Sequence, residues 1–265
     1  MPVDRVPFAE LPGPVREAVA RRVGACSAVD TAGGGNCAVA AVLTSPADRV
    51  FVKGIRSGHD QADELDLEYR VGPYLPDGCP RVRWRTETAG WVLVAFDAVA
   101  GEHADYRPGA ADLEAVVRAL TALGGTPAPP VALLSAGDRW GYYCAEGEVS
   151  LLAGDALLHT DLAATNVLVR GGRAHVVDWA WAARGAAWID AALWAVRLVS
   201  DGGHTPAGAA RWARRVPAFR TADPRAVAVL GRAEAARWAD LRDDGVPGIE
   251  RVTRGSRAWA AYWTR

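Results

Sequence analysis

The sequence is almost without lysine. Of its 30 lysine and arginine residues, Lys53 is the single lysine, and the other 29 are arginines. In a chain so biased toward arginine, we expect a lysine that serves merely as a positive charge to have been replaced. The compact ammonium group of lysine fits binding sites that the larger, planar guanidinium group of arginine does not fit. Lys53 is therefore a candidate functional residue.

Features that would indicate several other protein classes are missing. No apolar run approaches the roughly 20 residues needed to cross a bilayer, and the first residues lack a charged-then-apolar signal pattern. We therefore expect a cytoplasmic protein with no membrane partner. The formal net charge of -1 gives no reason to expect nucleic acid as a partner. The 4 cysteines lack metal-binding or redox spacing, so we expect them to be reduced.

The most informative stretch, Leu157–Trp179, reads LLHTDLAATNVLVRGGRAHVVDW. The segments VLVR and AHVV predict a β-hairpin around Gly171 and Gly172. The polar residues ahead of this hairpin follow the pattern H-x-D-x4-N, and an aspartate comes directly after it. These residues are His159, Asp161, Asn166 and Asp178.

The residue types in this stretch suit a metal and a reacting hydroxyl group. A hairpin can hold the Asn166 amide and the Asp178 carboxylate at the mouth of one cleft. Such hard oxygen ligands suit Mg²⁺, which takes its other ligands from water and phosphates. Asp161 would lie on the loop before the hairpin, where it could meet an incoming hydroxyl group.

The pattern resembles the catalytic loop of kinase-like phosphotransferases, in which a metal-binding aspartate follows H-x-D-x4-N. The sequence Asp-Trp-Ala, in place of Asp-Phe-Gly, and the short loop LAAT are closer to the aminoglycoside phosphotransferase family than to protein kinases. Thr160 stands where that family usually has Gly, and Ala163-Ala164 where it often has His-Pro. Neither change removes a charge or a metal ligand. The alternative is a surface loop with incidental acids and one capping Asn.

The resemblance, which covers residues from about 25 to 200, implies a two-lobed, protein-kinase-like α+β fold. Residues 1–99 would form a nucleotide-binding lobe with a small antiparallel sheet and one main helix. Residues 100–265 would form a larger, mostly helical lobe that carries the catalytic loop and the acceptor-binding helices. The implied ligands are ATP or GTP, Mg²⁺ and a small molecule with a hydroxyl group. The sequence does not indicate an oligomeric state.

The resemblance also assigns roles within the catalytic loop. Asp161 would be the catalytic base, and Asn166 and Asp178 would hold Mg²⁺. His159 would be a structural member of the loop, its imidazole hydrogen-bonded to the backbone beside the metal-binding aspartate. Asp190 matches the Asp of the family's D-x-A type motif, which anchors the loop. The alternative for Asp190 is an exposed acid in the first turns of a helix.

The first lobe has a glycine-rich segment ahead of Lys53. Gly33, Gly34 and Gly35 form the expected hairpin tip at the start of the second predicted strand, where backbone N–H groups could approach a phosphate without interference from Cβ atoms. Any flexible hairpin would share this property, but Lys53 on the next strand gives an order that resembles the family's small lobe, with Lys53 on the phosphates. Strands are predicted at residues 25–30, 33–43, 49–55, 82–87 and 90–96, after a helix at 14–23.

The predicted helix at residues 59–75 should supply a carboxylate that pairs with Lys53. Glu64 and Glu68 are four residues apart and share one face of this helix. The family pattern of Glu before an apolar stretch favours Glu68, with Glu64 as the alternative and a solvated helix face as the other interpretation of either residue. The last strand of this lobe leads to the expected hinge.

Asp97 and Val99 are the expected hinge residues, where backbone groups would bind the adenine edge. The register there is open by a residue or two, because backbone recognition leaves no side-chain pattern. In the second lobe, helices are predicted at residues 110–123, 138–152, 185–199, 207–216, 223–241 and 248–264.

The expected function is transfer of the γ-phosphate of a nucleoside triphosphate to a small-molecule hydroxyl group. A non-catalytic nucleotide-binding protein would be expected to lack one of the key residues, and none is missing. An Ala-Pro-Glu motif, typical of protein kinases, is absent after Asp178. Residues 201–265 contain 7 acidic residues and 12 arginines, a net charge of +5. This excess favours a small hydroxylated metabolite or antibiotic over a polycationic aminoglycoside, which remains the alternative.

Overall fold

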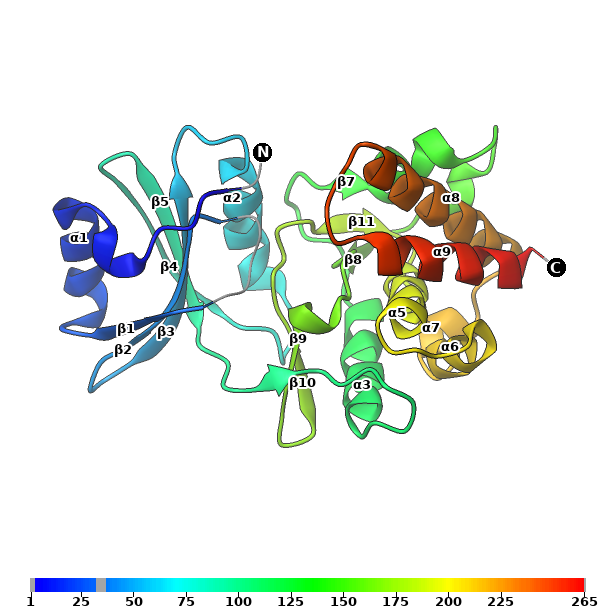
Figure 1. Ribbon diagram of the computed structural model, residues 1–265, viewed down its shortest axis with the longest axis horizontal. Coiled ribbons are helices and arrows are strands. Elements are labelled where there is room, and N and C mark those ends of the chain that lie inside the picture. Colours follow the sequence, from blue (N-terminus) through cyan, green and yellow to red (C-terminus); the bar gives the residue numbers. More distant parts are fainter. Residues whose placement is uncertain (1–2, 32–36, 265) are drawn as a thin grey trace. The chain divides into compact units, whose positions relative to one another are not determined.

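The computed structural model describes residues 3–31 and 37–264. The chain forms two compact units (Figure 1). The first comprises Met1–Ala100 and Val177–Trp181, and the second comprises Gly101–Val176 and Ala182–Arg265. A short segment that follows the predicted hairpin therefore packs with the first unit.

A five-stranded antiparallel sheet forms the centre of the first unit, with strand order β1-β2-β3-β5-β4. All five strands were predicted from the sequence. β2 begins at Val39, and the described residues Cys37 and Ala38 of the predicted strand do not pair in the sheet. The strands are β1 (Ser27–Asp30), β2 (Val39–Thr44), β3 (Arg49–Arg56), β4 (Val82–Thr88) and β5 (Trp91–Asp97).

Helices cover both faces of this sheet, which explains why β5 is buried along almost its whole length. Alternate residues of a strand point to opposite faces. Leu93 and Ala95 therefore pack in a core with the apolar side of α1 (Gly13–Val23), which follows the short turn η1 (Phe8–Glu10). Val92 and Val94 pack on the opposite face, in a core that includes Leu65 of α2 (Ala62–Val71). Figure 1 shows α1 and α2 on opposite sides of the sheet.

The helix predicted at residues 59–75 is α2 followed by a single 3-10 turn, η2 (Gly72–Tyr74). At its end the helix lies close to the sheet, since a Cβ atom on Gly72 would lie 2.1 Å from Cγ2 of Val82 in β4. Pro73 follows and cannot continue the α-helical hydrogen bonding.

The second unit is mainly helical. Its helices are α3 (Asp112–Gly124), α4 (Ala136–Trp140), α5 (Ile189–Ser200), α6 (Pro206–Ala213), α7 (Pro217–Arg220), α8 (Pro224–Asp243) and α9 (Glu250–Trp263), with 3-10 turns η3 (Gly141–Tyr143), η4 (Val149–Leu152) and η5 (Ala164–Asn166). Two small sheets accompany them, with strand orders β10-β9-β6 and β7-β11-β8. Their strands are β6 (Glu102–His103), β7 (Leu134–Ser135), β8 (Ala156–Leu158), β9 (Val167–Arg170), β10 (Arg173–Val176) and β11 (Ala183–Gly185).

Several predicted helices of this unit differ from the structure. The segment 138–152 is not one helix but α4, η3 and η4, interrupted at Gly147, whose φ is 78°. The helix predicted from residue 185 begins at Ile189, because residues 183–185 pair with β8 as β11. The C-terminal segment contains the short α7 in addition to the three predicted helices, because Pro217 and Pro224 each begin a new helix. The described helices include none with the length and apolarity that crossing a bilayer requires.

Helix α5 is the most enclosed of the described helices, with buried residues on all sides. An all-round apolar helix is stable when neighbouring elements cover it completely. Helix α9 approaches α5 especially closely at Gly255, where an added Cβ atom would lie 2.6 Å from Cβ and 2.8 Å from Cα of Ser200.

Gly255→Ala should lower the free energy of unfolding by about 1–3 kcal/mol, because the new methyl group overpacks a contact that includes backbone. Gly231→Ala in α8 is the matched control, because its Cβ atom would meet its nearest neighbour at an ordinary 3.4 Å. This control should be neutral, or stabilise by up to about 1 kcal/mol through helix propensity. Urea unfolding followed by tryptophan fluorescence checks both values. Equal effects of the two substitutions would contradict the close α5–α9 contact.

Candidate active site

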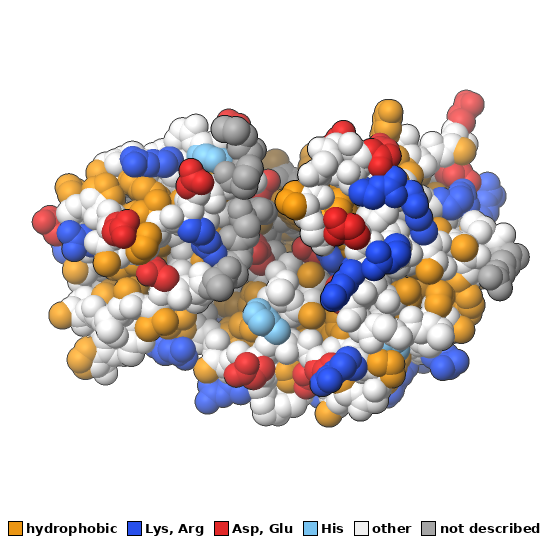
Figure 2. Space-filling view, viewed as in Figure 1, with side chains coloured by type: hydrophobic (Ala, Val, Ile, Leu, Met, Phe, Trp, Pro, Cys, Tyr) orange, Lys and Arg blue, Asp and Glu red, His pale blue; other side chains and the backbone are white. Residues whose placement is uncertain are grey.

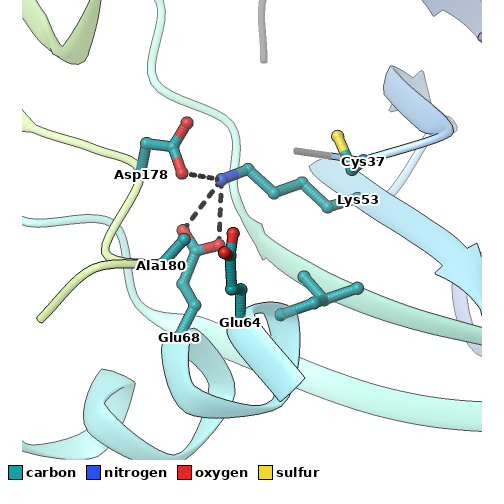
Figure 3. Close-up of a pocket in the computed structure, with 7 residues that line it drawn as sticks. Cys37, Lys53, Glu64, Glu68, Asp178 and Ala180 are labelled. Atoms are coloured by element: carbon teal, nitrogen blue, oxygen red, sulfur yellow. Dashed lines mark hydrogen bonds and ion pairs between the residues drawn. The ribbon is translucent and has the colours of Figure 1, made fainter. Parts of the chain in front are cut away.

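The single lysine forms two ion pairs in the first unit (Figure 3). Lys53 lies on β3, and its Nζ is 2.9 Å from Oε2 of Glu68 and 2.7 Å from Oδ1 of Asp178. Burial alone would lower the pKa of Lys53, but attraction by these two carboxylates raises the pKa above its ordinary value. Lys53 is therefore a fixed ammonium group between two acids.

The partner of Lys53 is Glu68 on α2, and the alternative, Glu64, is on the wall of the same small pocket. Glu68 makes a second contact, because its Oε1 accepts the backbone N–H of Trp179 at 3.2 Å. One buried carboxylate thus joins the lysine to the segment that contains Asp178. The pocket is lined by Cys37, Lys53, Glu64, Leu65, Glu68, Asp178 and Ala180.

Asp178 has an uncommon backbone conformation, with φ of 67°. Aspartate tolerates this left-handed region better than most residues other than glycine. The turn places Asp178 directly after the hairpin of β9 and β10, as the sequence predicts. Its side chain is 23% exposed, so it is accessible to a ligand.

The sequence also predicts nucleotide contacts at the glycine-rich segment and at the hinge. Gly33, Gly34 and Gly35 lie outside the described residues. Asp97 is the last residue of β5, where its N–H donates to the Arg81 carbonyl and its carboxylate accepts a hydrogen bond from Arg83. Val99 lies beyond the end of β5. Backbone recognition of a nucleotide by Asp97 and Val99 stays a prediction.

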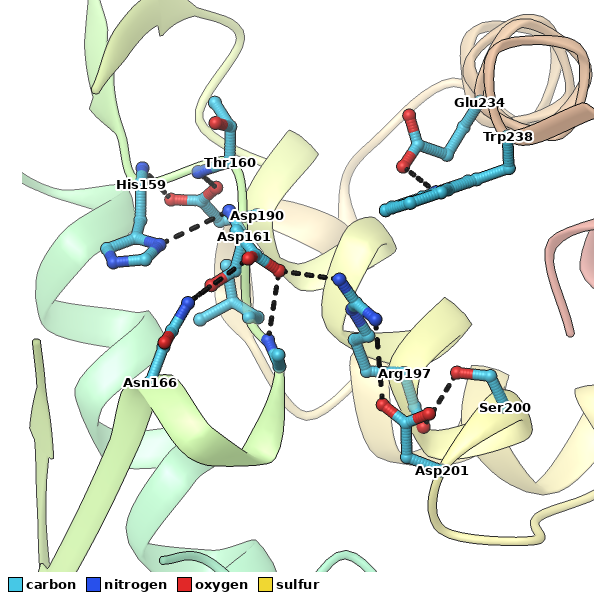
Figure 4. Close-up of polar contacts among 12 residues, drawn as sticks. His159, Thr160, Asp161, Asn166, Asp190, Arg197, Ser200, Asp201, Glu234 and Trp238 are labelled. Carbon is cyan, nitrogen blue, oxygen red and sulfur yellow. Dashed lines mark hydrogen bonds and ion pairs between the residues drawn. The ribbon is translucent and has the colours of Figure 1, made fainter. Parts of the chain in front are cut away.

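In the second unit, the loop that follows β8 is anchored by Asp190 of α5 (Figure 4). The Asp190 carboxylate accepts the backbone N–H groups of His159 at 2.8 Å and of Thr160 at 2.9 Å. The side chain is not the exposed acid of the alternative interpretation, because Asp190 is 3% exposed. A buried carboxylate requires such hydrogen bonds to offset the loss of hydration.

Both carboxylate oxygens of Asp161 are hydrogen-bonded within this loop region. Asn166 donates from Nδ2 to Oδ2 at 3.1 Å, and Arg197 of α5 donates from Nη2 to Oδ1 at 2.7 Å. His159 contributes through Nδ1, which accepts the N–H of Asp161 at 3.2 Å. The proposed base is thus oriented by an amide and a guanidinium group.

The loop is also held by Tyr106. Its buried hydroxyl group donates to the carbonyl of Leu162 at 3.0 Å. Burial raises the pKa of Tyr106 far above its ordinary value, so the hydroxyl group remains a donor. The Tyr106 carbonyl in turn lies 2.8 Å from Nε2 of His204.

Sequence reasoning missed Arg197 and Tyr106. A signal for Arg197 was available, because Asp190 and Arg197 are seven residues apart in an otherwise apolar helix. This spacing places both side chains on one helical face. No comparable pattern marks Tyr106, which contacts the loop from 56 residues away.

Asn166 fits the metal role by its orientation. Its Nδ2 faces Asp161, which leaves Oδ1 as the atom of the amide that could ligate a cation. Amide and carboxylate oxygens are the hard donors that Mg²⁺ prefers. Among the described residues, no three or more His, Cys, Asp or Glu side chains gather in a way that could hold a metal ion.

No protein-family model and no curated protein matches the sequence, whereas solved structures match over nearly the whole chain. Aminoglycoside phosphotransferase APH(4)-Ia, in a complex with AMP-PNP and hygromycin B, matches with a TM-score of 0.61 at 14% identity, over 94% of this chain and 99% of that one. Choline kinase LicA from Streptococcus pneumoniae has a TM-score of 0.66 at 13% identity, over 94% and 100%. Amicoumacin kinase hAmiN has a TM-score of 0.58 at 10% identity, over 96% and 95%.

The fold is that of the kinase-like phosphotransferases. The similarity confirms the two-lobed α+β fold and the resemblance to the aminoglycoside phosphotransferase family predicted from the sequence. The three proteins differ in the acceptor that their names give, so the kinase-like fold leaves the acceptor open.

Asp190→Asn should loosen the loop, because the amide replaces one acceptor oxygen by an NH₂ group that faces a backbone N–H. We expect a loss of about 1–3 kcal/mol in the free energy of unfolding and faster hydrogen exchange at His159 and Thr160. Asp223→Asn is the control, because it changes an exposed helix N-cap at which Asn serves as well as Asp. Unchanged exchange in the loop of the Asp190 variant would contradict the anchoring role.

Proposed function

We propose that this protein transfers the γ-phosphate of ATP or GTP to a hydroxyl group of a small molecule. The observation that best supports the proposal is Lys53, held by Glu68 and Asp178 in a kinase-like fold. Two of the similar proteins were solved with AMP-PNP, which supports nucleotide binding. We assign nucleotide binding to residues 1–99 and acceptor binding to residues 100–265.

In this proposal, Lys53 donates to the phosphates of the nucleotide, and Glu68 holds the ammonium group in position. Gly33 to Gly35 would cover the triphosphate, and the backbone near Val99 would bind the base. Asn166 and Asp178 would hold Mg²⁺. The chemistry that a bound Mg²⁺ supplies is neutralisation of charge on the phosphates.

Asp161 orients the acceptor hydroxyl group and takes its proton. The acceptor oxygen forms a bond to the γ-phosphorus, and the bond from this phosphorus to the bridging oxygen of the β-phosphate breaks. The hydroxyl proton passes to the Asp161 carboxylate, and the nucleoside diphosphate leaves. Arg197 and Asn166 keep the carboxylate in position, and such positioning is the main source of rate in phosphoryl transfer.

Asp161→Ala should lower turnover by about 10²–10⁴-fold, the usual contribution of a positioned acid–base group. Nucleotide affinity should change little, because Asp161 contacts the acceptor in this mechanism. Asp155→Asn, which alters a carboxylate with a 93% exposed side chain, serves as the control. A coupled assay of nucleoside diphosphate release measures both variants. Full activity of Asp161→Ala would show that Asp161 is not the catalytic base.

Lys53→Arg should inactivate the enzyme despite conservation of charge. The buried position between two carboxylates fits a compact ammonium, and the guanidinium fork is larger and planar. Glu64→Gln is the control, because Glu64 lines the same pocket while Glu68 makes the ion pair. Steady-state rates at saturating nucleotide decide the outcome. Near wild-type turnover of the Lys53→Arg enzyme would show that position 53 does not require an ammonium group.

The acceptor requires a direct screen with radiolabelled ATP and Mg²⁺ against aminoglycosides, macrolides, nucleosides, amino alcohols and sugars. Efficient phosphorylation of several aminoglycosides, with kcat/KM of about 10⁴ M⁻¹s⁻¹ or more, would favour the aminoglycoside alternative. ATP binding without turnover of any acceptor would favour a non-catalytic nucleotide-binding protein.

A further inference from the structure

Glu234 of α8 is a buried carboxylate that the proposed mechanism does not use. It is 5% exposed, and each of its two oxygens accepts a hydrogen bond from an indole ring. Oε2 accepts the N–H of Trp140 in α4 at 2.6 Å. Oε1 accepts the N–H of Trp238, one turn later in α8, at 2.5 Å. Hydrogen bonds to an ionised carboxylate are roughly twice as strong as neutral ones, so Glu234 fixes both rings.

The ring of Trp238 connects Glu234 with the catalytic loop. The Cζ atom of Arg197 lies 5.3 Å from the centre of this ring, within the range of a cation–π contact. Arg197 in turn donates from Nη2 to Oδ1 of Asp161 at 2.7 Å. Figure 4 shows the hydrogen bonds at the two ends. We call Glu234, Trp238, Arg197 and Asp161 the contact series, because each member touches the next.

Arg197 is enclosed, and its orientation depends on the groups packed against it. On the visible face of the second unit, arginine side chains gather at the surface over α8 and α9 (Figure 2), whereas the Arg197 side chain is only 15% exposed. Asp201 is a weaker partner of Arg197, because its Oδ2 lies 3.7 Å from Nη1 and its side chain is 29% exposed. The Trp238 ring is therefore important for the direction of the guanidinium group.

Opposite charges are paired along the contact series. Nη1 of Arg237 lies 3.8 Å from Oε2 of Glu234, and its Cζ lies 5.2 Å from the centre of the Trp238 ring. Burial alone would lower the pKa of Arg197, but attraction by Asp161 and by Glu234 helps to raise this pKa above its ordinary value. The paired charges suit the series to orient a side chain and not to bind a further ion.

We propose that Glu234 is a positioning residue for the phosphoryl transfer. It holds the Trp238 ring, the ring holds Arg197, and Arg197 directs the Asp161 carboxylate toward the acceptor hydroxyl group. This inference rests on the proposed function, because it takes Asp161 as the base. Glu234 itself touches neither the acceptor nor the nucleotide. A misplacement of about 1 Å by a change far from the reacting atoms can cost about 100-fold in rate, so a small movement of the ring is sufficient.

The role requires a carboxylate, because two N–H donors must be accepted at the same time. In Glu234→Gln, the amide oxygen can accept one indole N–H, while the NH₂ group faces the other. A buried donor that faces another donor is unfavourable, so one of the two rings must move. We therefore expect Glu234→Gln to lower kcat and to leave the KM for the nucleotide nearly unchanged.

Two matched substitutions separate positioning from general stability. Trp238→Phe and Trp140→Phe each remove one indole N–H from Glu234. The ring of Trp238 contacts Arg197, whereas that of Trp140 contacts Arg139 at 5.6 Å. Both variants should melt at a lower temperature, but Trp238→Phe should lower kcat by about 10–100-fold and Trp140→Phe by much less. Equal losses of kcat in the two variants would overturn the proposal.

A double-mutant cycle tests whether Glu234 acts through Arg197. Arg197→Lys keeps the positive charge and loses the planar group that packs on the ring. Each of Glu234→Gln and Arg197→Lys should lower kcat, and the double variant should be scarcely slower than the slower single variant, because both changes break the same series. Arg232→Gln is the control on the same helix, because Arg232 pairs with Glu148 at the surface. Independent, multiplying losses in the double variant would overturn the proposal.

Crystal structures of Glu234→Gln and Trp238→Phe distinguish this inference from the proposed function, because they need no turnover. The hydrogen bond from Arg197 to Asp161 should be lost in both variants. Its loss, together with no phosphorylation of any acceptor by the wild-type protein, would support the contact series and reject the proposed function. Phosphorylation by the wild-type protein, together with an intact bond and unchanged kcat in both variants, would support the function and reject the role of Glu234.

Discussion

Buried carboxylates that each hold two partners are the interaction on which this structure depends. Glu68, Asp190 and Glu234 are 4%, 3% and 5% exposed. Glu68 joins Lys53 to the Trp179 N–H, Asp190 joins two loop amides, and Glu234 joins two indole rings. Leaving such a charge buried and unpaired is strongly destabilising. Each carboxylate therefore fixes segments that are far apart in the sequence.

Helix α5 holds the loop that contains Asp161 through two residues on one face. Asp190 holds the backbone of the loop, and Arg197, two turns later, holds the Asp161 side chain. The remaining residues of the helix are almost all apolar and buried, so the helix has little freedom to shift. The geometry of the proposed base thus depends on the packing of the whole helix.

The sequence predicts those features that have a local pattern. The sheet of the first unit and helices α3, α5, α8 and α9 follow from periodicity, whereas β6, β7 and β11 are too short to show one. The choice of Glu68 over Glu64 also has a local reason, because Glu68 lies in the buried stripe between Leu65 and Val71. The contact between Glu234 and Trp140 has none, because the two residues are 94 positions apart in the sequence.

At Thr160, hydrogen bonds to Asp190 offset the strain of an unfavourable backbone conformation. The aminoglycoside phosphotransferase family usually has Gly at this position, and Thr160 has φ of 71°, in the left-handed region. This conformation costs a β-branched residue about 1–3 kcal/mol. The two charge-assisted hydrogen bonds from the His159 and Thr160 amides to Asp190 contribute about 1.5–3 kcal/mol each. The anchor therefore outweighs the strain, and the loop keeps its conformation without a glycine.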